Sequence, residues 1–335
     1  MTLLLEKIRG GFYGQALGDS WAMPALLNPG QTWDYYGGYI EEFLDAPEVH
    51  PVHRGLRRGQ VTDDTEQAAA IAEIIIRDGR VTAEGVAEAL VGWFQRINGE
   101  TSPYVGPSSR RAILAIQRGE DLNEVGRFGD TNGAGMRVSP VGLLHPGDVE
   151  GAISDAHLSC IPTHNTDVAI SGAAAVAGAI AMALKAGSTL DEMVEAGIYA
   201  GEQGRKLGHV WIGASVPARI RLAVSIARQK SPVRERLQEL YDVVGATLAI
   251  SEAVPAAFGV LVMAEGDPVQ AGILSAALSG DADTVAAMAC AMAGAWKGIS
   301  AFKPEYLTVM QQANPWLDFE AITTGLYDLA VKKVR

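Results

Sequence analysis

Two short acidic segments, far apart in the chain, carry the side chains best suited to chemistry. The first is Thr62-Asp63-Asp64-Thr65-Glu66 and the second is Gly280-Asp281-Ala282-Asp283-Thr284. Each supplies two adjacent or alternating aspartates and at least one hydroxyl, and each precedes an Ala-rich stretch with few charges. Because such apolar stretches are expected to be buried, we expect the carboxylates in front of them to point into the protein.

Helix capping is the simpler interpretation of either segment alone. Asp63, followed three residues later by Glu66, has the form of a capping box with Asp63 as the N-cap. One cap needs only one side chain, however, whereas each segment offers two aspartates. Four buried carboxylates repel one another unless a cation lies among them, and neither segment contains a Lys or Arg.

Hard divalent cations are the expected partners of these carboxylates and hydroxyls. Mg²⁺ and Mn²⁺ prefer carboxylate, hydroxyl and water oxygens as ligands. No His or Cys stands at a spacing typical of a zinc site. The two segments together therefore predict a site for Mg²⁺ or Mn²⁺.

Five motifs in a fixed order, the two acidic segments among them, resemble the ADP-ribosylglycohydrolase family. The resemblance runs from about Ile8 to Gly298, and the common order makes it specific although each motif is short. The motifs are Gly14-Gln15-Ala16-Leu17-Gly18-Asp19, Thr62-Asp63-Asp64-Thr65, Asn132-Gly133-Ala134-Gly135-Met136-Arg137, Thr163-His164 and Gly280-Asp281-Ala282-Asp283-Thr284.

This resemblance implies an all-α fold with a binuclear Mg²⁺ or Mn²⁺ site at its centre. Two such cations can hold a ribose diol and polarise a water for attack on the anomeric carbon, through an oxocarbenium-like transition state. An unligated carboxylate oxygen of Asp63 or Asp283 would then act as the general base. The metal ligands that the resemblance implies are Thr62, Asp63, Asp64, Asp281, Asp283 and Thr284.

The Gly-rich segment 129–137 is expected to line the substrate pocket. A turn before a helix is the plain interpretation of such a segment, but in the family this loop lies near ribose and phosphate and holds them with backbone donors. Asp19, a single acid, is interpreted as a structural anchor rather than a base. The substrate-binding residues implied by the resemblance are Asp130, Asn132, Gly133, Ala134, Gly135, Met136, Arg137 and His164.

Three positions depart from the family pattern. Leu26 stands where many relatives carry a catalytic Glu, and Leu neither ligates a metal nor accepts a proton. Asp130 stands where relatives that accept ADP-ribose often carry small or hydroxyl residues, and an inward carboxylate would repel a diphosphate. Trp21 adds bulk near the same loop. These changes favour a substrate without a diphosphate.

Three functions therefore stay open. The first is an ADP-ribosyl-acceptor hydrolase, and the second is a hydrolase of a smaller ribosyl compound such as a nucleoside. The third is a non-catalytic, crystallin-like member of the family. Both acidic segments are intact, which counts against the third, since a structural protein has no need to keep both.

The elements that must position these residues have the pattern of helices. Several of these segments are apolar on nearly all sides, which predicts a compact multi-helical bundle with Ala-rich helices at its centre. We expect helices to begin at Thr65 and Asp283. Apolar residues recur at three- and four-residue steps in 65–77, 83–97, 110–117, 167–184, 190–206, 247–263 and 281–296.

The rest of the chain contains little that would divide it. Residues 28–60 are rich in Gly, Pro and aromatic residues and are expected to form a long loop over one face, of a kind that often covers a site. No Pro- or Ser-rich linker follows, so one domain over residues 1–335 is expected. The stretch 170–184 is expected to be a buried core helix rather than a membrane span.

Composition limits the possible partners. Lys and Arg total 27 against 39 Asp and Glu, a net charge of −12 whose field repels nucleic acids. A small ribosylated compound or an ADP-ribosylated protein is the expected partner, with no nucleic acid and no membrane. Cys160 and Cys290 form no disulfide framework, and the N-terminal residues lack the order of a signal peptide, so a cytoplasmic location is expected.

Overall fold

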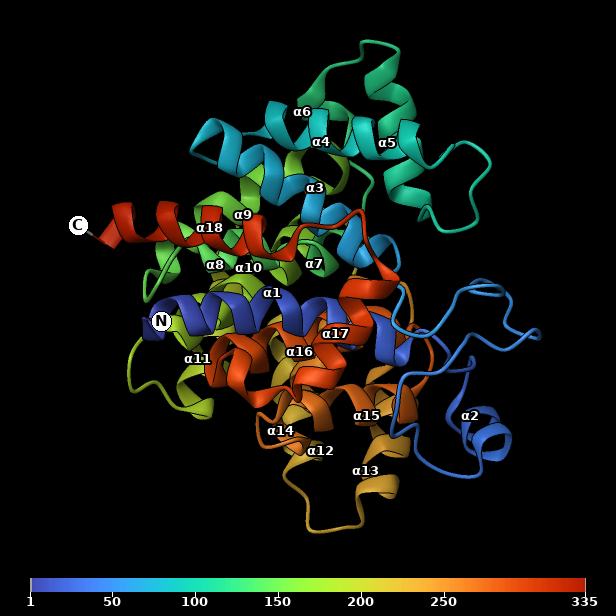
Figure 1. Cartoon of the computed structure of the whole chain (residues 1–335). Coiled ribbons are helices and arrows are strands. Elements are labelled where there is room, and N and C mark those ends of the chain that lie inside the picture. Colours follow the sequence, from blue (N-terminus) through green and yellow to red (C-terminus); the bar gives the residue numbers. More distant parts are fainter. Residues whose placement is uncertain (1, 335) are drawn as a thin grey trace.

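A computed structural model describes residues 2–334, in which the regular structure is helical (Figure 1). No strand is present in these residues, and Thr131 with Ala249 and Thr166 with His209 form isolated bridges. The all-α prediction is confirmed. The elements are α1 (Leu3–Ala22), α2 (Pro29–Tyr36), α3 (Asp63–Asp78), α4 (Ala83–Arg96), α5 (Pro107–Gln117), α6 (Leu122–Val125), α7 (Gly133–Met136), α8 (Ser139–Leu143), α9 (Val149–His164), α10 (Asp167–Leu184), α11 (Leu190–Gly204), α12 (Val216–Ala227), α13 (Val233–Glu239), the π-helical η1 (Leu240–Val244), α14 (Ile250–Met263), α15 (Pro268–Leu278), α16 (Ala282–Lys297), the 3₁₀-helical η2 (Ile299–Ala301), α17 (Pro304–Ala313) and α18 (Phe319–Val334).

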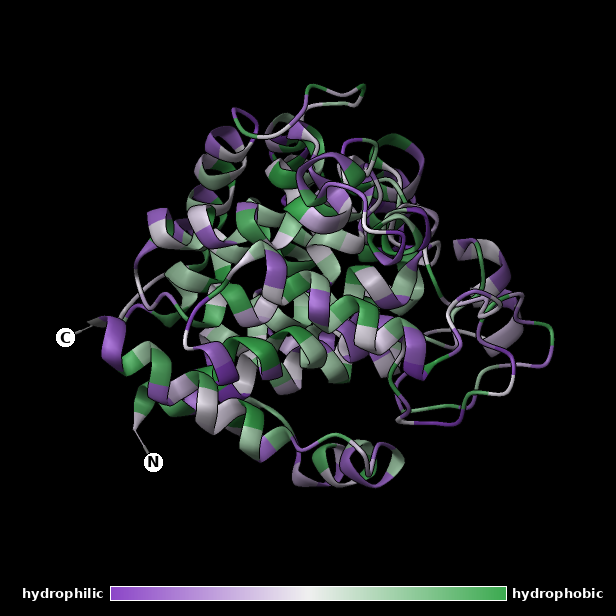
Figure 2. Ribbon diagram, turned by 90° about the horizontal axis from the view of Figure 1, so that it is seen from above, coloured by the Kyte–Doolittle hydropathy of each residue, from purple (hydrophilic) through white to green (hydrophobic). Residues whose placement is uncertain are grey.

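Helix α10 lies at the centre of the bundle. It packs against α8, α9, α11, α14 and α16, and all of its residues except Met182 are buried. By length and composition it could cross a membrane, but 94% of it is buried within the fold, as a core helix is. The prediction of a buried core helix is confirmed, and Figure 2 shows hydrophobic residues concentrated in the middle of the bundle.

The antiparallel pair of α1 and α16 brings the acidic residues together. Gly10, Gly14 and Gly18 of α1 face the backbone of α16, with Gly10 near Gly294 and Gly18 near Ala286. A Cβ atom at these three glycines would lie 2.2 to 2.3 Å from a carbonyl oxygen of α16, so a larger residue would push the helices apart. Close packing therefore sets the C-terminal end of α1 beside the N-terminal end of α16.

The starts of the two site helices differ from the prediction. Helix α3 begins at Asp63, not at Thr65, and Thr62 is its N-cap, with its hydroxyl accepting from the backbone N–H of Asp64 at 3.3 Å. Helix α16 begins at Ala282 rather than at Asp283. Because the Thr62 hydroxyl does the capping, the capping-box interpretation of Asp63 is wrong, and the Asp63 and Asp64 side chains are left for other contacts.

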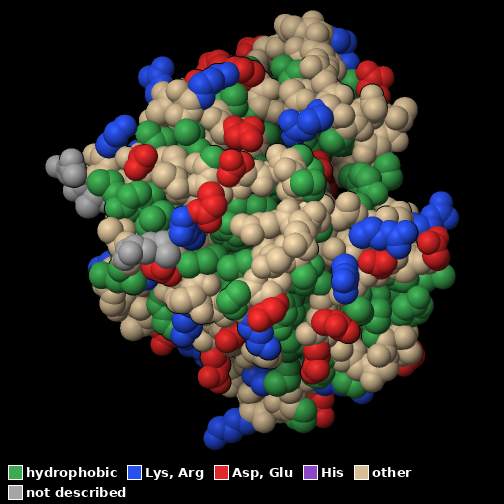
Figure 3. Space-filling view, viewed as in Figure 1, with side chains coloured by type: hydrophobic (Ala, Val, Ile, Leu, Met, Phe, Trp, Pro, Cys, Tyr) green, Lys and Arg blue, Asp and Glu red, His purple; other side chains and the backbone are tan. Residues whose placement is uncertain are grey.

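Residues 28–60 are not the continuous loop that we expected. Asn28 caps α2 by accepting from the backbone N–H of Gln31 at 2.9 Å, Pro29 opens the helix, and Gly37 ends it in a left-handed conformation with φ of 69°. The chain after α2 has no regular structure until α3 and lies at the right of Figure 1. On the face drawn in Figure 3, acidic and basic side chains are interspersed rather than gathered by sign.

Candidate active site

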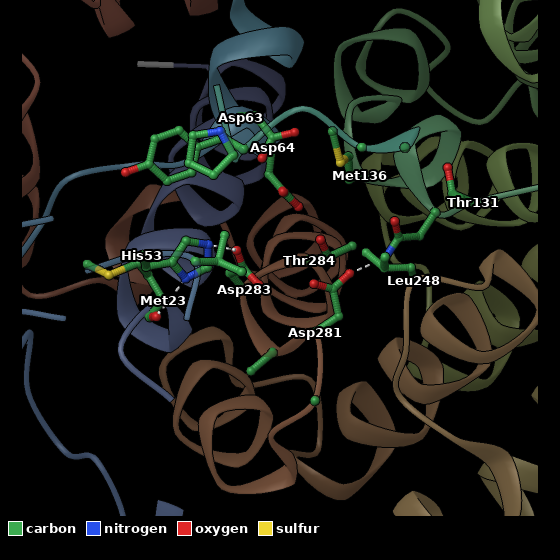
Figure 4. A pocket seen from close by; sticks show the side chains of 18 of the residues that line it. Met23, His53, Asp63, Asp64, Thr131, Met136, Leu248, Asp281, Asp283 and Thr284 are labelled. Carbon is green, nitrogen blue, oxygen red and sulfur yellow. Dashed lines mark hydrogen bonds and ion pairs between the residues drawn. The ribbon is translucent and has the colours of Figure 1, made fainter. Parts of the chain in front are cut away.

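A cavity of ≈ 210 Å³ opens where the ends of α1, α3, α7 and α16 meet. Four aspartates and Thr284 line it, and in Figure 4 the carboxylates of α3 and α16 face one another across it. The two acidic segments therefore line one cavity, and their role as a metal site stays a prediction. The lining residues used below are Met23, His50, His53, Asp63, Asp64, Tyr104, Thr131, Asn132, Gly133, Met136, Leu248, Asp281, Asp283 and Thr284.

A fifth carboxylate, that of Asp19, does not line this cavity but interacts electrostatically with Asp283, which does. It is fully buried at the end of α1 and accepts from the backbone N–H of Thr62 at 3.0 Å. It also accepts from the Thr65 hydroxyl at 2.6 Å and the Thr65 backbone N–H at 3.2 Å. Asp19 thus ties the first turn of α3 to α1, which confirms its interpretation as a structural anchor.

Burial makes all five carboxylates hard to ionise, and repulsion by Asp283 adds to this at the other four. Burial raises the pKa of Asp19 and of Asp281 to about 7, and that of Asp283 to about 6. The pKa values of Asp63 and Asp64 are raised well above the ordinary range, first by burial and then by the Asp283 charge. A cation among these side chains would favour the ionised forms and remove this cost.

The donor set fits a hard divalent cation. The Asp64 Oδ1 atom is buried without a hydrogen-bond partner, which is rare for a carboxylate oxygen in a folded protein. Carboxylate and Thr oxygens are the ligands that Mg²⁺ and Mn²⁺ prefer. Within residues 2–334 no three His, Cys, Asp or Glu side chains already converge as ligands of one ion, so the carboxylates would have to turn on binding.

Arg137 and its partners form a second buried polar group next to the carboxylates. The guanidinium donates to Gln67 Oε1 at 2.7 Å and to the Thr163 hydroxyl. Gln67 in turn donates from Nε2 to Asp63 Oδ2 at 3.0 Å. Burial lowers the pKa of Arg137 to about 10, which leaves it charged at neutral pH. Arg137 therefore orients Asp63 through Gln67 and does not line the cavity.

His164 also lies behind the cavity wall. It is fully buried, with Nδ1 2.7 Å from the Thr163 hydroxyl and Nε2 2.9 Å from the Thr131 hydroxyl. Burial lowers the pKa of His164 well below its ordinary value, so the ring is neutral at neutral pH. The ring supports Thr131, which lines the cavity, rather than facing the cavity itself.

The Gly-rich loop presents only one of its faces to the cavity. Asn132, Gly133 and Met136 line it, whereas Ala134 and Gly135 are buried on the other side of the short helix α7. The Asn132 side chain donates to Asp281 Oδ2, which holds that carboxylate in place. Three of the expected substrate contacts therefore lie at the cavity surface.

The three departures from the family pattern do not enter the cavity. The Asp130 carboxylate accepts from Trp211 Nε1 at 3.1 Å. Leu26 lies in a separate surface hollow beside Tyr35. Trp21 is fully buried and donates from Nε1 to the Ile40 carbonyl at 2.9 Å. Asp130 would repel a diphosphate only if its carboxylate pointed into the cavity. The carboxylate contacts Trp211 instead, so the structure does not support the predicted repulsion.

His53 lines this cavity but lies outside the sequence motifs. Its Nε2 lies 3.2 Å from Asp283 Oδ2, and its Nδ1 lies 3.0 Å from the Met23 carbonyl oxygen. Burial lowers the pKa of His53, and burial with the nearby His53 charge lowers that of His50 to about 4. Two histidines three residues apart in the loop before the first acidic segment were a signal in the sequence. Tyr104 was a further omission, without a comparable signal.

Comparison with known proteins gives consistent results. The pattern of the family described as ADP-ribosylglycohydrolase matches residues 1–333. YegU of Escherichia coli (strain K12), described as uncharacterized, is 34% identical over 96% of each chain. ADP-ribosylarginine hydrolase Tri1 of Pseudomonas putida (strain GB-1) is 24% identical over 90% of this chain and 74% of its own. A solved structure described as an ADP-ribosylglycohydrolase-related protein complex has a TM-score of 0.72 at 21% identity, over 98% of this chain and 100% of that one.

Proposed function

The chain belongs to the ADP-ribosylglycohydrolase family, an enzyme family that hydrolyses glycosidic bonds, and on this basis we propose that it is a metal-dependent hydrolase of ADP-ribosyl-acceptor bonds. The observation that carries the proposal is the cluster of five buried or half-buried carboxylates, four of which line one cavity. Asp64 Oδ1 has no partner there, and no Lys or Arg is among the residues that line this cavity in the described chain. Such a cluster suits cations and the neutral diol of a ribose.

Two Mg²⁺ or Mn²⁺ ions would be held by oxygens from both acidic segments. When bound, such ions neutralise the carboxylates, orient ribose hydroxyls and make a water more acidic. Neighbouring side chains already orient two of these carboxylates, because Asn132 donates a hydrogen bond to Asp281 and Gln67 donates one to Asp63. The proposed ligands are Thr62, Asp63, Asp64, Asp281, Asp283 and Thr284.

Asp63 is the general base that the geometry favours. It is less buried than Asp64 and faces the cavity, while Gln67 engages its Oδ2 atom. In the proposed reaction Asp63 accepts a proton from the water that attacks the anomeric carbon. The bond from that carbon to the acceptor nitrogen or oxygen breaks with its electron pair on the leaving group. Asp283, which contacts His53, is the second candidate for this role.

A smaller ribosyl compound is the second candidate substrate. The cavity of ≈ 210 Å³ is below the roughly 300–1,000 Å³ that is usual for pockets of drug-sized ligands. It suits a ribosyl group with a small leaving group better than a whole ADP-ribose. The contact of Asp130 with Trp211, on the other hand, removes the electrostatic argument against a diphosphate.

A hydrolysis screen tests both candidates. The full-length protein would be supplied with Mg²⁺ or Mn²⁺ and offered ADP-ribosyl-arginine, ADP-ribosyl-serine, O-acetyl-ADP-ribose and free nucleosides, with and without EDTA. We expect release of the acceptor from an ADP-ribosyl substrate and its loss in EDTA. Turnover of nucleosides alone would select the second candidate. Turnover that persists in EDTA would contradict metal dependence.

A further inference from the structure

His53 reaches the carboxylate cluster from the irregular segment between α2 and α3, outside both acidic segments. Its side chain is 10% exposed, and its Nε2 lies 3.2 Å from Asp283 Oδ2. Figure 4 shows that one ring nitrogen points toward Asp283 and the other toward the Met23 carbonyl. The side chain thus presents a nitrogen atom to a group of oxygens.

Several contacts hold this ring in one orientation. A carbonyl oxygen only accepts hydrogen bonds, so Nδ1 carries the hydrogen in its 3.0 Å contact with Met23. The ring stacks on that of His50, with centroids 4.6 Å apart and planes at 16°, and lies nearly parallel to the Tyr104 ring at 6.2 Å. The backbone N–H of His53 also donates to His50 Nδ1 at 2.9 Å. The direction of Nε2 is therefore set before anything binds.

We propose that His53 Nε2 is a ligand of the divalent cation that Asp283 binds, an inference that rests on the proposed metal-dependent function. Metal-binding histidines donate their other ring N–H to a carbonyl or carboxylate, and His53 has this arrangement with Met23. Neighbouring ligands at about 2.1 Å from one ion lie about 3 Å apart. The 3.2 Å between Nε2 and Asp283 Oδ2 is close to that separation.

His50 is a natural control, because it shares the loop and the stack but has no free nitrogen. Its Nε2 donates to the Ala25 carbonyl at 2.9 Å. Its Nδ1 accepts from the backbone N–H groups of Val52 at 3.2 Å and His53 at 2.9 Å. Both ring nitrogens of His50 are thus occupied by backbone, whereas only one of those of His53 is.

A nitrogen ligand changes which ions the site prefers. Imidazole favours the later first-row metals, whereas Mg²⁺ prefers oxygen and keeps its waters. Removing the nitrogen should therefore weaken Co²⁺ binding far more than Mg²⁺ binding. If all ligands were oxygens, removing the His53 ring would change neither the Co²⁺ affinity nor the Mg²⁺ affinity.

Calorimetry on the full-length protein tests this directly. We expect His53→Gln to lower Co²⁺ affinity at least about tenfold and Mg²⁺ affinity less than about threefold. His50→Gln removes the ring that stacks on His53 but no proposed ligand, so it should lower Co²⁺ affinity less than His53→Gln does. Equal Co²⁺ affinity in the wild type and His53→Gln would overturn the proposal.

A measurement on the unaltered protein covers the case in which the variant fails to fold. With Co²⁺ bound through Nε2, the Nδ1–H of His53 lies near a paramagnetic ion and should give a strongly shifted, exchangeable proton NMR signal. If Co²⁺ binds without such a signal, His53 is an ion-pair partner of Asp283 and not a ligand, and the proposed function stands. If the wild type binds none of Co²⁺, Mn²⁺ and Mg²⁺, both proposals fail.

Discussion

The carboxylate cluster and the Arg137 network lie side by side, but the charge of Arg137 is compensated by hydrogen bonds whereas the carboxylates repel one another. Arg137 is surrounded by neutral acceptors, chiefly Gln67 and Thr163, which satisfy its donors. The carboxylates instead face one another, and Asp64 Oδ1 has no partner. A satisfied network stabilises the fold, whereas a repelling cluster with an unpaired oxygen is destabilising until a cation binds. We therefore expect the first region to stabilise the fold and the second to bind ligands.

Removing one carboxylate gives the largest expected effect on function. Asp283→Asn should lower Mn²⁺ affinity at least about 100-fold and hydrolysis at least about 1,000-fold, because it removes a charge that the ions require. The metal-free protein should be at least as stable as the wild type at pH 8, since a repulsive charge is gone. Calorimetry, turnover and thermal melting check the three parts.

A matched control for this variant is Asp121→Asn, at the exposed N-cap of α6. Asn caps a helix as well as Asp does, so neither metal affinity nor turnover should change. Unchanged Mn²⁺ affinity in Asp283→Asn would contradict the assignment of the cluster. A large loss of metal-free stability would show that the cluster supports the fold as the Arg137 network does.

The Arg137 network should behave in the reverse manner. Arg137→Met leaves Gln67 and Thr163 without their donor and should lower the free energy of unfolding by about 3 kcal/mol. Urea denaturation of the metal-free protein measures this. Ser109→Ala removes only the 3.4 Å contact and should cost less than about 1 kcal/mol. Equal effects of the two substitutions would mean that Arg137 is not held as described.

The two regions also differ in their dependence on pH. The pKa values of Asp19 and Asp281 rise to about 7 in the fold, so between pH 4 and 7 the metal-free folded state binds more protons than the unfolded chain. Its stability from these groups therefore falls as the pH rises through that window. In the Arg137 network, the lowered pKa of His164 acts in the opposite sense below about pH 6.5.

Stabilisation by Mn²⁺ should consequently grow with pH. Ions and protons compete for the same oxygens, so the rise in melting temperature on adding Mn²⁺ should be larger at pH 8 than at pH 5 by about 5 °C or more. Melting curves in EDTA and in Mn²⁺ at both pH values give the comparison. In Asp283→Asn the difference should shrink. A rise that is equal at both pH values would contradict competition at these carboxylates.

The smallest effect is expected at Asp130. Its carboxylate is bound to Trp211 and does not line the cavity, so Asp130→Ser should change the ratio of ADP-ribosyl-arginine to nucleoside turnover less than about threefold. Adding Leu26→Glu, whose side chain would start from the separate hollow near Tyr35, should add little. A tenfold or larger shift would show that Asp130 faces the substrate during turnover.

The helices and the pairing of the acidic segments could be predicted from the sequence. Helical periodicity is a local property, since positions three and four apart share a face wherever the helix lies, and α10 and α16 follow it closely. The start of α3 was displaced by two residues because a threonine hydroxyl, not an aspartate, caps this helix. The two acidic segments could be paired because their charge and the order of the motifs are properties of the sequence itself.

Which side chains face the cavity was decided only by tertiary packing. The stripe of Gly10, Gly14 and Gly18 lets α1 approach α16 closely enough for Asp19 to interact electrostatically with Asp283. Packing also turns Arg137 away from the cavity and brings His53 to Asp283 from a segment without regular structure. Such a segment has no periodicity that fixes the direction of its side chains. Its contacts depend on the whole fold, so the spacing of His50 and His53 in the sequence did not by itself place His53 beside Asp283.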